Sequence, residues 1–144
     1  EYLAEKNPAL LPADPAARAI ARAVTAEMHA GFQNLRSRMP MNVRKDYTGF
    51  GHSPEVDADI ARIVAIWNDC RARFGAVGPY LFGRFSLADA AFAPVAFRFQ
   101  TYAVKPAGAA GEYLATLLAN PHMQEWATAA RAETESIPEE DLYG

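Results

Sequence analysis

The sequence predicts an all-α domain, and three observations support this fold class. Apolar residues recur at steps of three and four over several long segments, which is the spacing of one helix face. Three segments open on a polar N-cap residue followed by proline, a pair typical of helix starts: Asp14-Pro15, Ser53-Pro54 and Asn120-Pro121. No stretch alternates with period two and no Asn-Gly hairpin signal occurs, so nothing in the sequence indicates a strand.

Composition narrows the class of protein. The 144 residues suit one domain with a sizeable core, and 51% hydrophobic with 22% charged residues is typical of a globular chain. A net charge of −3 argues against a nucleic-acid-binding protein, and no apolar run reaches the roughly 18 residues that a membrane span needs. The single cysteine, Cys70, favours a reducing compartment. Because the chain begins at Glu1 rather than a methionine, we expect a piece of a longer protein.

The first long helix is predicted from Asp14 to about Arg38, after a helix end over residues 1–6 and a proline-rich connector over 7–15. Its core stripe comprises Ile20, Val24, Gly31 and Leu35. About a quarter turn away lie Met28, Phe32 and Met39. This flank is either the rim of the core or, because methionine adapts to varied ligands, the wall of a hydrophobic pocket. The opposite side, a solvated face or a partner face, carries Arg18, Arg22, Gln33 and Arg36.

A loop follows Pro40 and extends to His52, with Tyr47 and Phe50 expected to be exposed. The second long helix starts at Ser53-Pro54 and has the clearest amphipathic stripe: Val56, Ile60, Ile63, Trp67, Cys70 and Phe74. Cys70 lies on that stripe, and burial makes a thiol inert, so a structural role is favoured over a catalytic one.

The central helix is predicted from Leu87 to about Tyr102. Ser86 is its N-cap, and Asp89 three residues later completes a capping box. No charge occurs from Ala90 to Phe97, which indicates a helix enclosed by others, and Pro94 predicts a bend rather than an end. Arg98 either extends to solvent or pairs with a carboxylate, or it binds a substrate anion.

The last third of the chain is predicted to hold a turn over 105–111, a short helix over 112–119 and a helix starting at Asn120-Pro121. The inner face of that last helix comprises Met123, Trp126, Ala127 and Ala130. An acidic tail with Glu139, Glu140 and Asp141 is expected to lie along the surface.

The sequence offers little that indicates catalysis. The three histidines, His29, His52 and His122, are dispersed without the spacing of a zinc site, so we predict no metal. No Gly-x-Ser-x-Gly elbow, phosphate loop or GxGxxG occurs. Paired carboxylates appear only in polar surroundings that would not shift their pKa.

Three segments resemble the glutathione S-transferase superfamily. Residues 83–89, Gly-Arg-Phe-Ser-Leu-Ala-Asp, with Ala93-Pro94-Val95, resemble the signature that caps the central helix of that family's all-helical C-terminal domain. Residues 27–42 resemble its fourth helix in bacterial members, and residues 120–126 resemble its late proline-containing helix. The resemblance implies a bundle of about five to six helices over 14–144. Residues 1–13 would be the end of the preceding domain and the linker, and Phe85 would form only a weak hydrophobic staple with Ala90.

The resemblance also implies a function. In the family a thioredoxin-like domain, absent from this chain, binds glutathione and supplies the Ser, Tyr or Cys that activates its thiol. This chain would then be the electrophile-binding half of a cytoplasmic, homodimeric enzyme, inactive alone and without a catalytic residue or metal. The implied site has Met28, Phe32 and Met39 as apolar wall, Arg36 and Arg98 as anchors for an anionic group, and Tyr102 as a further candidate.

Two alternative functions remain open at this point. Transferase-like domains also occur as non-catalytic protein-interaction modules, which would bind another protein and not glutathione. The first long helix also suggests a zeta-like isomerase of the maleylacetoacetate type, in which Arg98 would matter most.

Overall fold

The computed structural model describes residues 2–135, 137–138 and 141–143, and its regular structure there is helical. The α-helices are α1 (Tyr2–Lys6), α2 (Pro15–Ala30), α3 (Gln33–Arg38), α4 (Pro54–Phe74), α5 (Leu87–Thr101), α6 (Gly108–Leu118) and α7 (Pro121–Ala132), and two 3-10 turns are η1 (Pro8–Leu10) and η2 (Gly75–Val77). Over these residues the only β contacts are isolated bridges within 80–84. The predicted all-α class is confirmed. Three residues of the sequence predictions lie outside the described residues. They are Glu1 of the helix end over 1–6, and Glu139 and Glu140 of the acidic tail.

The three predicted N-cap and proline pairs all start helices. The side chain of Asp14 accepts a hydrogen bond from the Ala17 amide at 2.7 Å. In the same way, Ser53 accepts one from the Val56 amide at 3.3 Å, and Asn120 accepts one from the His122 amide at 2.9 Å. Each side chain satisfies an amide of the first turn that has no partner within the helix. These local pairs therefore fix where α2, α4 and α7 begin.

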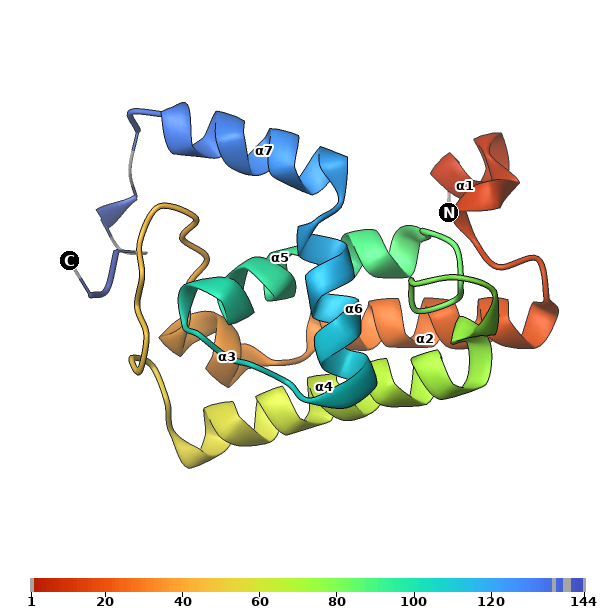
Figure 1. Ribbon diagram of the computed structural model, residues 1–144, viewed down its shortest axis with the longest axis horizontal. Coiled ribbons are helices and arrows are strands. Elements are labelled where there is room, and N and C mark those ends of the chain that lie inside the picture. The colour runs from red at the N-terminus through yellow and green to blue at the C-terminus, as the bar shows by residue number, and fades with distance from the viewer. Residues whose placement is uncertain (1, 136, 139–140, 144) are drawn as a thin grey trace.

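The prediction of one helix from Asp14 to Arg38 is wrong, because the chain breaks between α2 and α3 (Figure 1). The Gly31 amide donates to the Glu27 carbonyl at 2.8 Å, and a Cβ atom at Gly31 would lie 2.8 Å from that same oxygen. Glycine is therefore required at this close approach. Phe32 then adopts the left-handed conformation at φ 62°, ψ 40°, which no α-helix can contain. The split raises the number of helices above the five to six expected.

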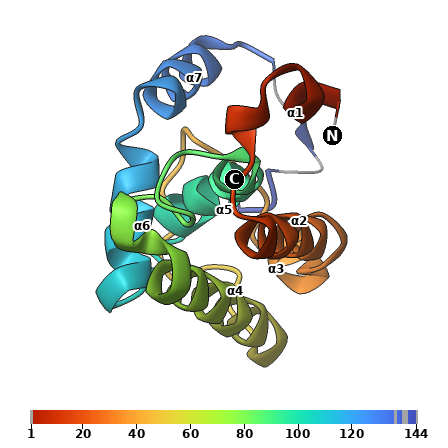
Figure 2. The ribbon, with the colours of Figure 1, turned by 90° about the vertical axis from the view of Figure 1, so that its right-hand side faces the viewer.

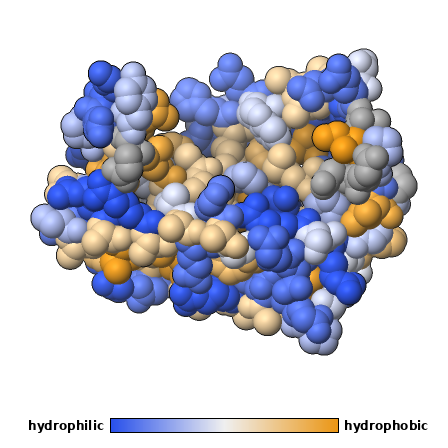
Figure 3. Space-filling view, turned by 180° about the vertical axis from the view of Figure 1, so that it is seen from behind, coloured by the Kyte–Doolittle hydropathy of each residue, from blue (hydrophilic) through white to orange (hydrophobic). Residues whose placement is uncertain are grey.

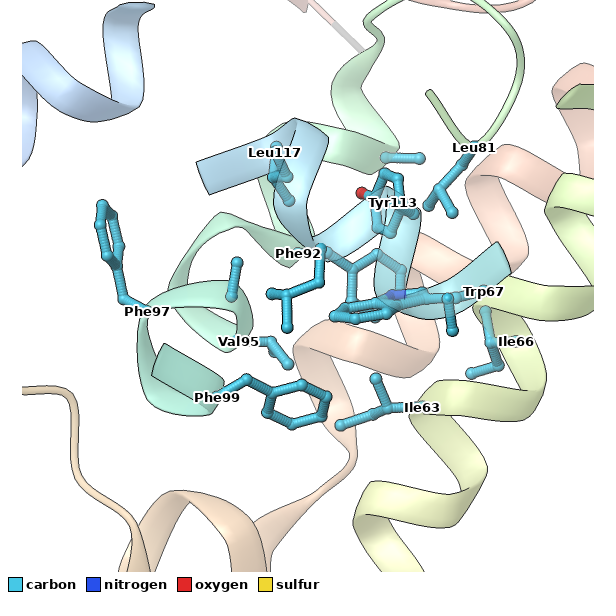
Figure 4. Close-up of a cluster of buried hydrophobic side chains, with 14 of the residues drawn as sticks. Ile63, Ile66, Trp67, Leu81, Phe92, Val95, Phe97, Phe99, Tyr113 and Leu117 are labelled. Atoms are coloured by element: carbon cyan, nitrogen blue, oxygen red, sulfur yellow. The ribbon is translucent and has the colours of Figure 1, made fainter. Parts of the chain in front are cut away.

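Helix α5 lies at the centre, with α2, α4, α6 and α7 arranged around it (Figure 2). Trp67 of α4 occupies the middle of the core, where its ring centroid lies 5.8 Å from Phe92, 5.3 Å from Phe99 and 4.9 Å from Tyr113 (Figure 4). Pro94 is interior to α5, and the helix continues through it as predicted. The stripe of α4 is also confirmed, since Val56, Ile63, Trp67 and Cys70 are fully buried.

The predicted capping box at Ser86 and Asp89 is confirmed and is larger than expected. One Asp89 carboxylate oxygen accepts the Ser86 amide at 2.8 Å and the Ser86 hydroxyl at 2.9 Å. The other accepts the Leu81 amide at 3.1 Å. Asp89 thus fixes both the start of α5 and the connector before it. The ring of Phe85, which the sequence pairs with Ala90 in a weak hydrophobic staple, lies edge-on to the Tyr80 ring.

Three smaller predictions are wrong for tertiary reasons. Tyr47 is 3% exposed, because its ring packs against Tyr102 and Tyr143. Trp126 is 46% exposed, although its ring contacts Phe97 at 5.2 Å between centroids. Helix α6 begins at Gly108 rather than 112, since Asn68 of α4 accepts the first-turn amide of Ala110 at 3.1 Å.

Candidate functional site

A small cavity lies where α2, α3 and α5 meet. Its volume is about 30 Å³, and it is lined by Met28, Phe32, Leu35, Arg36, Pro94, Val95 and Arg98. Four of the six predicted site residues are therefore brought together: Met28, Phe32, Arg36 and Arg98. The volume is that of about one water molecule, so a larger ligand requires a wall side chain to move.

The other two predicted residues, Met39 and Tyr102, do not line this cavity. Met39 is fully buried, and Tyr102 is 1% exposed with its hydroxyl donating to the Pro40 carbonyl at 3.1 Å. Both lie in the core beside the site, where they hold the segment that follows α3. The sequence prediction missed three wall residues, Leu35, Pro94 and Val95, because the pattern assigns them to the interiors of helices.

Arg36 binds the end of α2. Its Nε donates to the Gly31 carbonyl at 3.1 Å, and its Nη2 donates to the carbonyls of Met28 and His29. The last carbonyls of a helix have no partner within it and carry the negative end of its dipole, so a guanidinium is well placed there. Arg36, which the sequence placed on a solvated face, is half-buried and positioned by these bonds.

Arg98 reaches the same cavity from α5. Its Nε donates to the Met39 carbonyl at 2.8 Å, and its Nη1 approaches the Pro94 carbonyl at 3.3 Å. Two half-buried arginines, Arg36 and Arg98, thus border one small cavity. Once a wall side chain moves, such a space can receive an apolar group together with an anionic one, since each guanidinium carries a fixed positive charge.

Burial raises the pKa of titratable groups in the core. Burial raises the pKa of the Cys70 thiol from 9.0 to about 11, so the thiolate needed for nucleophilic attack is suppressed at neutral pH. Burial also raises the pKa of Asp89, and hydrogen bonds from Leu81 and Ser86 oppose that shift in part. Within the described ranges, no three His, Cys, Asp or Glu side chains are grouped closely enough to hold a metal ion.

A second and larger groove of about 800 Å³ lies beside α1. It is lined by the connector after α1, by the start of α2 and by Phe74, Val77, Phe82, Arg84 and Phe85. In the view from behind, a recess with mostly apolar walls is visible there (Figure 3). The sequence pattern does not indicate this groove, because its walls come from segments that are distant in the chain. None of the helices over the described residues has the length and apolarity to cross a membrane.

Comparison with known proteins identifies one matching protein family. No curated protein matches the chain. Residues 51–129 match the protein family described as "Glutathione S-transferase, C-terminal domain". This stretch includes all of α4, the capping box, α5 and α6, and most of α7. The match covers more than half of the 144 residues, and the all-α fold agrees with it, so the chain belongs to the glutathione S-transferase C-terminal domain family.

Proposed function

We propose that this chain is the electrophile-binding domain of a glutathione S-transferase-like enzyme that adds, exchanges or uses glutathione on a small hydrophobic or anionic electrophile. The observation that carries the proposal is the cavity at the junction of α2, α3 and α5. There an apolar wall of Met28 and Phe32 adjoins the guanidinium groups of Arg36 and Arg98.

The chemistry of such an enzyme is divided between two domains. A thioredoxin-like domain outside these residues would bind glutathione and lower the pKa of its thiol, since the thiolate is the nucleophile. This chain would hold the electrophile beside that thiolate and exclude water from it. Arg36 binds the end of α2 through Nε and Nη2, and we assign its Nη1 to an anionic group of the substrate. Met39 and Tyr102 would support the site from the core.

The larger groove is the proposed seat of the thioredoxin-like domain. Tyr2 and Leu3 of α1 are 69% and 59% exposed, and Val77 at the groove is 79% exposed. Burial of such apolar side chains stabilises a domain interface. We also propose a homodimer, in which the outer faces of α2 and α4 contribute, and a cytoplasmic location, which the single buried cysteine supports.

The test uses the complete enzyme, glutathione and a panel of neutral and anionic electrophiles. We expect consumption of the glutathione thiol, and we expect the present chain alone to be inactive. Arg36→Gln should raise KM at least tenfold for an anionic electrophile and leave KM for a neutral one within twofold. Arg73→Gln, at an exposed arginine of α4, is the matched control and should change neither.

Absence of conjugation, reduction and isomerisation over the whole panel would refute the enzymatic function. Failure of the complete protein to be retained on immobilised glutathione would favour a protein-interaction module instead.

A further inference from the structure

The backbone of Phe32 is in a conformation that its side chain disfavours. A bulky residue at φ 62° is an outlier, since the left-handed region brings Cβ close to the backbone carbonyl. Asn, Asp or Gly would adopt this conformation at lower cost. Such strain persists only where the surrounding structure holds it, and it is found preferentially at ligand sites.

Two features of the surroundings hold Phe32 in place. On one side, Arg36 ties the carbonyls of Met28, His29 and Gly31 together, which fixes the chain just before Phe32. On the other side, Pro94 of α5 lines the same cavity. The break between α2 and α3 and the proline of α5 therefore border the same cavity.

The position of the Phe32 ring limits the space at the site. Phe32 is 8% exposed and lines a cavity of only about 30 Å³. A cavity that holds benzene has a volume of about 150 Å³. The remaining space therefore takes no aromatic electrophile unless a ring-sized group leaves the wall. Phe32 is the one aromatic side chain in that wall, and its withdrawal frees the volume of one phenyl ring.

We propose that Phe32 is the specificity-determining residue of the site, and that the substrate is a flat electrophile whose single aromatic ring takes the place of the Phe32 ring. This inference rests on the proposed function, because the bound electrophile is a substrate only if the complete protein is an enzyme. The strained backbone lowers the free energy needed to move Phe32 out of the wall. An electrophile with two fused rings exceeds the space that one phenyl ring leaves.

The first experiment measures thermal unfolding of the full chain with benzene as the probe. We expect benzene to raise the Tm of Phe32→Ala by about 4 °C at a free concentration of ten times its Kd, and to leave the wild type within about 1 °C. Phe97→Ala is the matched control, because Phe97 is buried but packs against the exposed Trp126 and does not line the cavity. Benzene should not shift that variant. Equal shifts in the two variants would overturn the inference.

The second experiment compares glycine with alanine at both positions. Strain at Phe32 predicts that Phe32→Gly has a higher Tm than Phe32→Ala, because glycine accepts a positive φ. At Phe97, within α5, the order should be reversed. A Phe32→Gly variant with the lower Tm of its pair would refute the role assigned to strain.

The third experiment uses the complete enzyme. Phe32→Gly should lower the preference in kcat/KM for a one-ring over a two-ring electrophile at least tenfold, and Phe97→Ala should leave it within twofold. An unchanged preference would overturn the specificity role. If the wild-type enzyme turns over no electrophile, the proposed function fails. The benzene shift and the glycine and alanine order then still decide whether Phe32 closes a ring-sized site.

Discussion

Replacing Asp89 with alanine should destabilise the domain strongly, although this residue touches no candidate substrate site. Its carboxylate is fully buried and accepts three hydrogen bonds, from the Ser86 amide, the Ser86 hydroxyl and the Leu81 amide. These bonds join the connector before α5 to the first turn of that central helix. Alanine would remove both acceptor oxygens and so all three hydrogen bonds at once.

The magnitude follows from the partners that are left behind. Loss of a helix cap costs about 0.5–2 kcal/mol. The Leu81 amide would also be left unpaired in the interior, which costs about 1–3 kcal/mol. The raised pKa of Asp89 shows that burial disfavours its charge, so removing that charge offsets part of the loss. We therefore expect a net loss of about 2–3 kcal/mol, or a fall in Tm of roughly 6–9 °C.

Urea denaturation followed by circular dichroism measures this loss. Asp89→Asn, which keeps the size and one acceptor oxygen, should lose about half as much free energy of unfolding. Asp69→Ala removes an aspartate of α4 that is exposed and paired with Arg73, and it should cost less than about 0.5 kcal/mol. A loss for Asp89→Ala no greater than that for Asp69→Ala would refute the reasoning.

Two further predictions concern the core. The pKa of Cys70 is raised from 9.0 to about 11, so the neutral thiol contributes stability that is present below pH 9 and is lost as the pH rises through about 11. The wild type should lose roughly 3 kcal/mol of unfolding free energy in this way. Urea titrations at pH 8 and pH 11 should show that Cys70→Ala loses correspondingly less. A variant whose unfolding free energy depends on pH as strongly as that of the wild type would contradict this. Trp67→Ala should cost about 3–5 kcal/mol, because the side chain is fully buried among three aromatic rings. Trp126→Ala should cost less than about 1 kcal/mol in the same assay, since that ring is half exposed, and equal losses would show that burial does not govern the two sites.

Helix starts were predictable because their causes are local. The side chains of Asp14, Ser53 and Asn120 each cap an amide two or three residues away, so the pattern is visible in the sequence itself. The start of α6 was not predictable, since its amide is capped by Asn68 from another helix. The burial of Tyr47 also depends on distant residues, because Tyr143 packs against its ring.

The candidate site was predictable in part for the same reason. Helical spacing places Met28 and Phe32 on one flank, and both line the cavity. The spacing fails beyond Gly31, where the approach to the Glu27 carbonyl ends α2 and turns Arg36 from the solvated side toward the helix end. The small volume of the cavity follows from packing between three helices, which no single segment encodes.

The segment after α3 is held to α5 mainly through its own backbone oxygens. The carbonyls of Met39, Pro40 and Asn42 accept from Arg98, Tyr102 and Thr101 respectively. Every residue type offers the same carbonyl, so substitutions in this loop keep these bonds, whereas an insertion or deletion displaces the acceptors from their donors. These bonds therefore constrain the length of the loop, whereas its side chains are constrained only where they pack into the core, as at Met39 and Tyr47.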